Sequence, residues 1–384
     1  MFGHASSAAI LDTNFNASAN NTVYAVAVQP ADQKILIGGA FDQVNGAAHY
    51  NIARLNTDGT TDTGFTTGLD GVVNVIVVQA DNKILIGGSF TEINGTDRAF
   101  IGRLNADGTT DTAFAKGMTL NGSVLAIAPQ SDGRIIIGGT FTMINGGNYP
   151  RLGRLLSNGA LDTSYGIGYV SGPVYALALH PADGTTNAGK VYVAGDFQFA
   201  VGYQRLRVAR LMPYPYQAWL DTSFGTATSG ANGTVKALTV YLHPGTPNIP
   251  KILIGGAFTQ VNSENHNKVA RLELNGLPDM FWNGSSLDNT VNTMAIDLGS
   301  SPLMVTIGGD FTSVEGFVRR SVARLNLEQG TVAFWNTGTG AGGTQPTVES
   351  LAIQNDGKVV IGGSFTLFEG QTRNRIARLH HDEQ

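Results

Sequence analysis

The 384 residues include 42% hydrophobic but only 14% charged side chains, with fifty glycines and no cysteine. The lack of cysteine excludes disulfides, thiol catalysis and Cys₂His₂ zinc sites, and the net charge of −5 argues against a nucleic-acid partner, which requires a basic face. No apolar run approaches the roughly eighteen residues of a membrane-spanning helix, so no membrane insertion is expected.

The first fifteen residues combine two features. They lack the basic start and the apolar run of a secretory signal peptide, so either the protein is not secreted by that route or this is a mature or trimmed form. In addition, Leu-Asp-Thr-Asn-Phe at residues 11–15 matches Thr-Asp-Thr-Gly-Phe at residues 61–65. The N-terminal segment therefore copies a piece of the chain that lies fifty residues further on.

The stretch that follows reads as four short strands. Residues 23–29 are apolar on both faces, as expected for a strand packed between neighbouring sheets. Residues 34–41, 51–56 and 61–65 form the next three strands, and Asp58-Gly59 makes the last turn. Because every connection is short, we expect an antiparallel meander.

The second strand ends in Ile-Gly-Gly-x-Phe, and this motif or a close variant recurs seven times, 49 to 61 residues apart. A period near fifty residues in β-rich sequence indicates propeller blades. The predicted blades span residues 23–65, 72–114, 123–165, 173–224, 234–282, 290–335 and 346–380. The glycine pairs are expected to allow close blade-to-blade approach or a bulge, and the phenylalanine to pack between blades.

The seventh repeat ends soon after Leu379, before a fourth strand, and residues 8–15 match the missing piece. We therefore predict an all-β, seven-bladed β-propeller of four-stranded antiparallel blades that forms a single domain over residues 1–384. The N-terminal strand completes the last blade and closes the ring.

Every repeat has one arginine in its third strand. These are Arg54, Arg103, Arg154, Arg210, Arg271, Arg324 and Arg378. An aspartate follows eight residues after most of them, as Asp62 follows Arg54, and a three-residue loop with a left-handed Gly59 would place the two side chains opposite each other. We expect a structural ion pair rather than an anion channel. Blade six has Val332 at the aspartate position, so Arg324 needs another acceptor.

The strings at residues 83–90, 101–109 and 111–114 resemble the delta-60 repeat, a bacterial β-propeller repeat family. This resemblance implies a propeller, commonly in large exported or surface proteins, and no general catalytic residues. The glycine doublet is also similar to kelch-type propellers, although the later Tyr and Trp spacing of kelch blades is missing. The Trp-Asp pair of WD40 repeats is missing too.

One position supplies a candidate ligand-binding face. Three residues before each Ile/Leu/Val-Ala/Gly-Arg-Leu motif stand His49, Arg98, Tyr149, Arg205, His266, Arg319 and Arg373. These side chains either cap carbonyls of adjacent loops or form an annular surface for a glycan, an acidic polymer or a partner protein, since Arg and aromatics are enriched at interface hot spots.

Two further features are candidates for binding. The loops that lead into each new blade are rich in Gly, Asn, Ser and Thr, as at residues 225–234 and 336–344. On the opposite face, Tyr214, Tyr216 and Trp219 form a candidate docking patch, with a packed loop as the alternative.

Catalysis is not expected, because acids, bases and metal ligands do not converge. None of the seven histidines has zinc-ligand spacing, and only Asp70 and Asp288 stand in the loops around the predicted central tunnel. We expect no metal or cofactor. The preferred function is a non-catalytic binding or adhesion module, extracellular or on the cell surface, with a glycan or protein partner. The alternatives are a structural subunit of a larger extracellular or secretion-related assembly and, with least support, a hydrolase or lyase at the tunnel.

Overall fold

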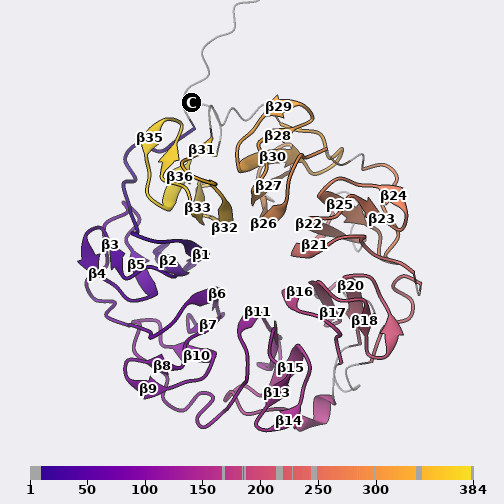
Figure 1. Ribbon diagram of the computed structural model, residues 1–384, viewed down its shortest axis with the longest axis horizontal. Coiled ribbons are helices and arrows are strands. Elements are labelled where there is room, and N and C mark those ends of the chain that lie inside the picture. The colour runs from indigo at the N-terminus through magenta and orange to yellow at the C-terminus, as the bar shows by residue number, and fades with distance from the viewer. Residues whose placement is uncertain are drawn as a thin grey trace, which may run out of the picture.

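Seven main antiparallel sheets surround a central opening in the computed structural model of the chain (Figure 1). The structure describes residues 10–166, 169–183, 185, 187–212, 219–226, 228–243, 249–282, 284, 286–297, 299–333 and 340–381. The sheets are arranged like blades, and each has its first strand next to the opening. The all-β seven-bladed propeller is therefore confirmed.

Each blade has three paired strands. In blade 1, β1 (Val23–Val28) pairs with β2 (Ile35–Gly39), which pairs with β5 (Ile52–Leu55). The corresponding strands of blades 2 to 4 are β6 (Val73–Val78), β7 (Ile84–Gly88), β10 (Ile101–Leu104), β11 (Val124–Pro129), β12 (Ile135–Gly139), β15 (Leu152–Leu155), β16 (Val174–Leu179), β17 (Val191–Gly195) and β20 (Val208–Leu211). Those of blades 5 to 7 are β21 (Val235–Leu242), β22 (Pro250–Gly256), β25 (Val269–Leu272), β26 (Val291–Asp297), β27 (Met304–Gly309), β30 (Val322–Asn326), β32 (Val348–Ile353), β33 (Val359–Gly363) and β36 (Ile376–Leu379).

In every blade, a small hairpin of two-residue strands lies in the connection between the second and third strands, toward the outer rim of the ring (Figure 1). These hairpins are β3 (Gln43–Val44) with β4 (Ala47–Ala48), β8 (Glu92–Ile93) with β9 (Thr96–Asp97), β13 (Met143–Ile144) with β14 (Gly147–Asn148), β18 (Phe199–Ala200) with β19 (Tyr203–Gln204), β23 (Gln260–Val261) with β24 (Glu264–Asn265), β28 (Ser313–Val314) with β29 (Phe317–Val318), and β34 (Leu367–Phe368) with β35 (Gln371–Thr372). In blade 7 a further strand, β31 (Ala341–Gly342), pairs with β34.

The fourth strand of each blade is shorter than the sequence suggested. In blade 1 it is a single antiparallel bridge, between Leu55 and Thr61, and the same bridge recurs in every other blade. Blade 3 follows it with one turn of 3₁₀ helix, η1 (Thr163–Tyr165), where the sequence predicted no helix; the Asp162 side chain caps its start. No helix in the described part of the chain has the length and apolarity to span a bilayer.

The N-terminal segment completes blade 7, as predicted. Leu11 forms an antiparallel bridge with Leu379, the Asp12 amide donates to the Arg378 carbonyl at 2.8 Å, and the His380 amide donates to the Ile10 carbonyl at 2.7 Å. Innermost strand β1 of the first blade also packs against β32 of the last. These contacts close the ring. The predicted start of the outer strand at residue 8 lies outside the described residues.

The glycine pairs serve both of the purposes expected of them. A Cβ on Gly38 would lie 2.5 Å from Val73 Cγ1 of the next blade, so this glycine permits close blade packing. A Cβ on Gly39 would lie 2.1 Å from the Thr22 carbonyl oxygen, beside a β-bulge at Tyr24 in β1. Phe41 is fully buried, as the motif predicted.

The predicted arginine pairs are present. Arg54 Nε lies 2.7 Å from Asp62 Oδ2, and Gly59 between them has φ +90°. The same pairing joins Arg103 to Asp111, Arg154 to Asp162, Arg210 to Asp221, Arg271 to Asp279, and Arg378 to Asp12. In blade 7 the pair thus links the two ends of the chain.

Within the described residues, six of the seven arginines also donate to a backbone carbonyl of the next blade, which the sequence pattern did not predict. Arg103 Nη1 donates to the Ser157 carbonyl of the next blade at 2.9 Å, and Arg378 reaches Thr57 of blade 1 across the closure. The guanidinium also lies over the aromatic ring that ends the outer segment, as Arg103 does over Phe114 at 4.3 Å. One side chain therefore links the outer segment, its own sheet and the next blade.

A second cation shares the aspartate in six blades. Lys34 Nζ lies 2.8 Å from Asp62 Oδ2, and Lys83, Arg134, Lys190, Lys251 and Lys358 hold the equivalent place. The recurrence of a basic residue at the start of the second strand was the sequence signal that could have revealed it. Blade six lacks both groups. Met304 occupies the cation position, and Ala333 rather than the predicted Val332 occupies the aspartate position, because Val332 forms the bridge that Thr61 forms in blade 1; Arg324 instead pairs with Asp297 at 2.9 Å.

These carboxylates predict an acid-sensitive fold. Burial alone would raise the pKa of Asp62, but Lys34, the Gly64 amide and Arg54 outweigh it and lower that pKa to about 2. Because the folded-state pKa is lower than the unfolded one, the stabilisation is complete above about pH 4 and is lost as the pH falls toward 2. We expect the melting temperature to drop steeply over this interval, and less so for Asp62→Asn. An unchanged melting temperature would contradict the ion-pair assignment.

Candidate functional site

The walls of the central opening differ from one end to the other. Near the end of each innermost strand stands one half-buried apolar residue, and these are Val28, Val78, Pro129, Leu179, Val240, Ile296 and Ile353. At the opposite end each innermost strand contains the bulge described for β1. The bulge residues are mostly polar, so the opening has an apolar mouth and a polar mouth.

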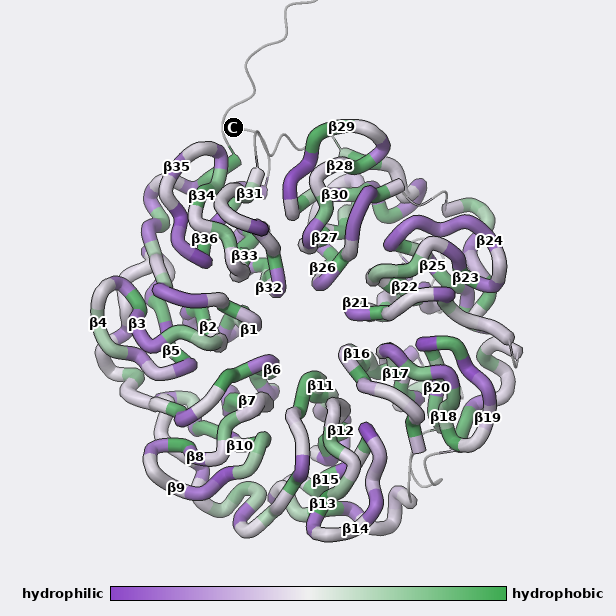
Figure 2. The backbone as a smooth tube through the Cα atoms, in the orientation of Figure 1, coloured by the Kyte–Doolittle hydropathy of each residue, from purple (hydrophilic) through white to green (hydrophobic). Residues whose placement is uncertain are grey.

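We call the seven bulge residues the bulge ring; they are Tyr24, Asn74, Leu125, Tyr175, Lys236, Asn292 and Glu349. They are at least partly exposed, and unlike the arginine position they differ from blade to blade. In Figure 2, β6, β21 and β26 are polar at the rim of the opening whereas β11 is apolar. Variation at a geometrically repeated, exposed position suits recognition better than packing.

Hydrogen bonds connect the bulge residues of blades 5 and 6 and hold that of blade 7. Lys236 Nζ donates to Asn292 Oδ1 at 2.8 Å, and Asn292 Nδ2 donates to Asp310 Oδ1 at 2.7 Å. In blade 7, Thr347 Oγ1 donates to Glu349 Oε1 at 2.7 Å. These bonds orient an amide and two carboxylates at the polar mouth.

Blade 7 breaks the symmetry at the same mouth. In six blades the bridge residue of the incoming loop stands four positions before the innermost strand, as Ala19 does before Val23. In blade 7 the distance from Ala341 to Val348 is seven positions, which is an insertion of three residues, Gly343–Gln345. The other six loops also have a side chain that caps two amides of the small hairpin, and these are Asn20, Asp70, Asn121, Ser171, Asn232 and Asp288. Blade 7 has Gly342 at that position.

Two cavities flank the insertion. The first, of about 490 Å³, lies between blades 6 and 7 and is lined by Asn289, Asp310, Thr312, Arg320, Ser321, Gly342, Gly343, Gln345, Pro346 and Thr347. The second, of about 560 Å³, lies between blades 7 and 1 and is lined by Thr22, Tyr24, Gly343, Thr344, Gln345, Thr347, Glu349, Ser364, Thr366 and Arg375. We call the two together the insertion groove. Each volume is in the range of small-molecule sites.

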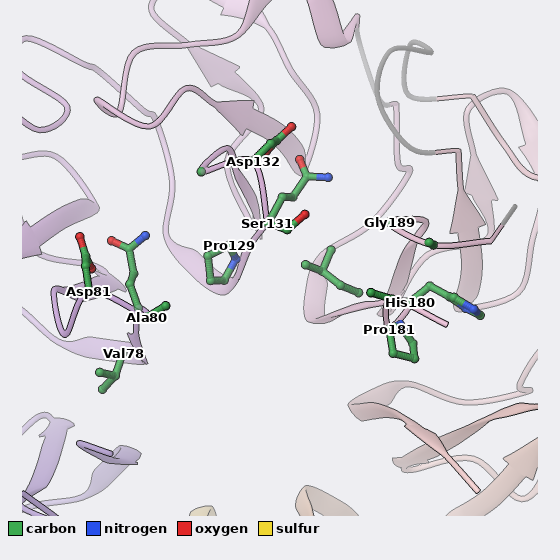
Figure 3. A pocket seen from close by; sticks show the side chains of 15 residues that line it. Val78, Ala80, Asp81, Pro129, Ser131, Asp132, His180, Pro181 and Gly189 are labelled. Atoms are coloured by element: carbon green, nitrogen blue, oxygen red, sulfur yellow. The ribbon is translucent and has the colours of Figure 1, made fainter. Parts of the chain in front are cut away.

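A larger cavity, of about 820 Å³, opens at the apolar mouth between the turns of blades 2, 3 and 4 (Figure 3). Its wall includes Val78, Pro129, Leu179 and Pro181. The carboxylates at its edge are engaged in their own turns: Asp81 accepts from the Lys83 amide at 3.1 Å, and Asp132 from the Arg134 amide at 3.0 Å. The free polar groups on its wall include Gln79 Oε1 and Gln130 Oε1, which are buried and have no hydrogen-bond partner among the described residues.

The seven candidate residues of the predicted face follow the small hairpins, so each belongs to the outer part of its own blade rather than to the opening (Figure 1). Arg98, Arg205 and Arg373 are buried; each donates to a backbone carbonyl of its own hairpin, as does half-buried Arg319. His49, Tyr149 and His266 are half-buried, and burial lowers the pKa of both histidines. The arginine contacts favour the carbonyl-capping interpretation.

Arg98 offers a test of that interpretation. Its Nη1 lies 2.7 Å from the Asp97 carbonyl oxygen and its Nη2 lies 2.6 Å from the Thr112 carbonyl oxygen. We expect Arg98→Ala to lower the free energy of unfolding by about 1–3 kcal/mol, because two carbonyls lose their donors. The control Arg320→Ala, at an exposed arginine, should change the free energy of unfolding by less than about 0.5 kcal/mol. Urea unfolding measures both, and an Arg98→Ala variant as stable as wild type would refute the capping role.

The structure also shows where the other predicted site residues lie. Tyr214 and Tyr216 lie outside the described residues, and Trp219 is 58% exposed, so the docking patch stays a prediction. Asp70 and Asp288, considered as acids at the tunnel, cap hairpin amides instead. The described part of the loop at 336–344 borders the insertion groove. The bulge ring was not predicted from the sequence, although the residue after the first valine of each innermost strand differs between repeats.

The chemistry available at the polar mouth is hydrogen bonding and ion pairing. Among the described residues there is no group of three or more His, Asp or Glu side chains placed to hold a metal ion. The bulge ring offers one cation, one carboxylate, two phenols and two amides. Such a set can orient a polar ligand in a ring-shaped site.

The comparisons with known proteins agree with the architecture. The family described as "Domain of unknown function (DUF5122) beta-propeller" matches residues 31–65, 79–114, 130–165, 189–213, 251–281, 304–332 and 354–382, one segment in each blade. The chain belongs to the DUF5122 β-propeller family. The matched segments leave out the bulge ring of every blade, so family membership says nothing of the residues there. The resemblance to the delta-60 repeat remains a prediction at that finer level.

Among solved structures, the DUF5122 chain is similar to the "WD40 beta propeller domain of Doa1", with a TM-score of 0.56 and 12% identity over 98% of this chain and 97% of that one. At this identity the likeness concerns the fold alone. No curated protein matches the sequence significantly.

Proposed function

We propose that this DUF5122 propeller is a non-catalytic binding module that recognises its ligand at the polar mouth of the central opening. The single observation that carries the proposal is the contrast between two repeated positions. The arginine position is uniform in all seven blades, whereas the bulge ring has Tyr, Asn, Leu, Lys and Glu at equivalent places. The scaffold is repeated, and the exposed ring upon it is not.

The energetics support this division of roles. The arginine pairs, the glycine contacts and the inter-blade clusters hold the ring rigid, and a rigid frame lowers the entropic cost of ordering a site. The hydrogen bonds of Lys236, Asn292 and Asp310 hold polar groups in place at the mouth. We infer that this protein is exported or attached to the cell surface and presents this face to a glycan or a protein partner.

A ligand screen by thermal shift tests the proposal. Binding to the folded state raises the melting temperature, and we expect that shift to vanish in the triple variant Tyr24→Ala/Lys236→Ala/Glu349→Ala, whose melting temperature without ligand should stay close to wild type. The matched control is Leu125→Ala, which shortens the apolar member of the same ring and should keep the ligand-induced shift of the melting temperature. A ligand whose shift survives the triple variant would refute the site, and turnover of the bound ligand would refute the non-catalytic role.

A structural-subunit role is the second candidate, and one observation favours it. Met280 and Phe281, on the outer segment of blade 5, are 72% and 89% exposed, where blade 1 has Thr63 and Gly64. Exposed apolar side chains at neighbouring positions are typical of interfaces. Light scattering distinguishes the two roles: a defined oligomer that Phe281→Ser dissociates supports a subunit, and a monomer at all concentrations argues against a homo-oligomeric one.

A further inference from the structure

The insertion in blade 7 places two polar cavities side by side at the mouth used by the proposed function. The cavities share Gly343, Gln345 and Thr347, so a ligand longer than one ring can extend from one to the other. We propose that the insertion groove binds a neutral oligosaccharide. This inference rests on the proposed binding function and adds the class of ligand.

The charges in the groove are balanced on each side of the insertion. The cavity between blades 6 and 7 has Asp310 and Arg320, and the cavity between blades 7 and 1 has Glu349 and Arg375. One carboxylate and one guanidinium in each cavity suit a ligand without net charge, because a polyanion would meet a carboxylate in both. None of the described residues that line the two cavities is a lysine.

The groove contains both kinds of polar group that hydroxyl-rich ligands need. Sugar hydroxyls both donate and accept, so they pair with carboxylates and with guanidinium or amide N–H groups. Asp310 accepts from Asn292 through Oδ1, and Glu349 accepts from Thr347 through Oε1, so the second oxygen of each carboxylate is left for a ligand. The Arg320 guanidinium is exposed and lines the cavity between blades 6 and 7, where it can donate to a ligand.

An aromatic ring completes the groove. Tyr24 is 37% exposed and lines the cavity between blades 7 and 1 beside Glu349 and Arg375. The C–H face of a pyranose is apolar, so packing on a tyrosine ring removes apolar surface from water while the phenol keeps a polar contact. A platform beside paired donors and acceptors favours a sugar over an extended peptide bound by strand addition, which needs a free strand edge.

The insertion explains why this site lies in only one place around the ring. In the other six loops the four-residue spacing and the capping side chain hold the incoming loop on its hairpin. In blade 7 the cap is lost at Gly342, and Gly343–Gln345 project between two blades. Removing these three residues would restore the spacing of the other blades.

The test is an array of neutral and acidic oligosaccharides, followed by titration calorimetry with the strongest neutral hit. Tyr24→Ala and Arg320→Ala should each weaken the Kd about 10-fold to 100-fold, as expected for lost stacking or a lost charged hydrogen bond. Deletion of residues 343–345 should abolish binding. The control Lys116→Ala, at an exposed cation just after blade 2 and outside the bulge ring and both cavities, should leave the Kd within about twofold, and circular dichroism checks that each variant folds.

Four results would overturn the inference. Neutral saccharide binding that survives both substitutions and the deletion would place the site elsewhere. Binding of acidic saccharides alone would refute the neutral class. A peptide or other ligand that binds in place of any saccharide, and is lost in the triple ring variant, would refute the sugar but leave the proposed function standing. A chain that binds nothing in either screen would contradict both.

Discussion

Removal of residues 1–15 is expected to abolish cooperative folding of the propeller at ordinary temperatures. Ile10, Leu11 and Phe15 are almost completely buried, and each contributes about 1.5–3 kcal/mol through its apolar surface. The truncation also leaves Arg378 without Asp12, its partner at 2.9 Å. The combined loss of about 8–14 kcal/mol is comparable to the whole free energy of unfolding of a typical domain.

Rescue in trans distinguishes ring opening from general damage. A synthetic peptide of residues 8–19 should restore the melting transition of the truncated chain in a concentration-dependent way, because it replaces the missing outer segment. The same peptide with Asp12→Ala should need a much higher concentration. Calorimetry of the mixture measures both. A truncated chain that melts like the full chain without peptide would show that the N-terminal segment does not close the ring.

The second large effect is expected at a deeply buried ion pair. Arg154 has no exposed side-chain surface, and its Nη2 lies 2.8 Å from Asp162 Oδ2. We expect Asp162→Ala to lower the free energy of unfolding by about 3–5 kcal/mol, because a buried guanidinium loses its counter-charge. Denaturant unfolding gives the value directly.

The matched control is Asp132→Ala, since Asp132 contacts the same Arg134 as Asp162 but is 38% exposed at its side chain. That change should cost about 1 kcal/mol or less. The double variant Asp162→Ala/Arg154→Leu should recover part of the loss, because it removes the buried charge that Asp162 no longer neutralises. If Asp162→Ala and Asp132→Ala lower the free energy of unfolding equally, burial does not determine how strongly these ion pairs stabilise the fold.

The repeat itself made the fold predictable from sequence. Seven copies of Ile-Gly-Gly-x-Phe set the blade number, and the match of residues 11–15 to residues 61–65 showed which end supplies the missing segment. The Arg54–Asp62 pair followed from strand register and the left-handed Gly59. Each of these features depends on contacts that every blade makes in the same way.

The candidate site was less predictable because it depends on departures from the repeat. Arg98 resembled a surface donor, but its guanidinium folds back on two carbonyls, and nothing in the local sequence distinguishes those outcomes. Tyr24 looked like one more residue in an alternating strand, and only the bulge exposes it. Likewise, three extra residues before Val348 become visible once the bridges align the loops.

Closure of the ring by the N-terminal segment can be tested directly with one engineered crosslink. The natural sequence has no cysteine, and the bonds that flank the Leu11–Leu379 bridge define a non-hydrogen-bonded pair, whose Cα separation of about 4.5 Å suits a disulfide. Under mild oxidation, Leu11→Cys/Leu379→Cys should give one intramolecular disulfide, identified by mass spectrometry of the linked peptides. Free thiols in the folded protein, or only crosslinks between molecules, would contradict the closed seven-bladed ring.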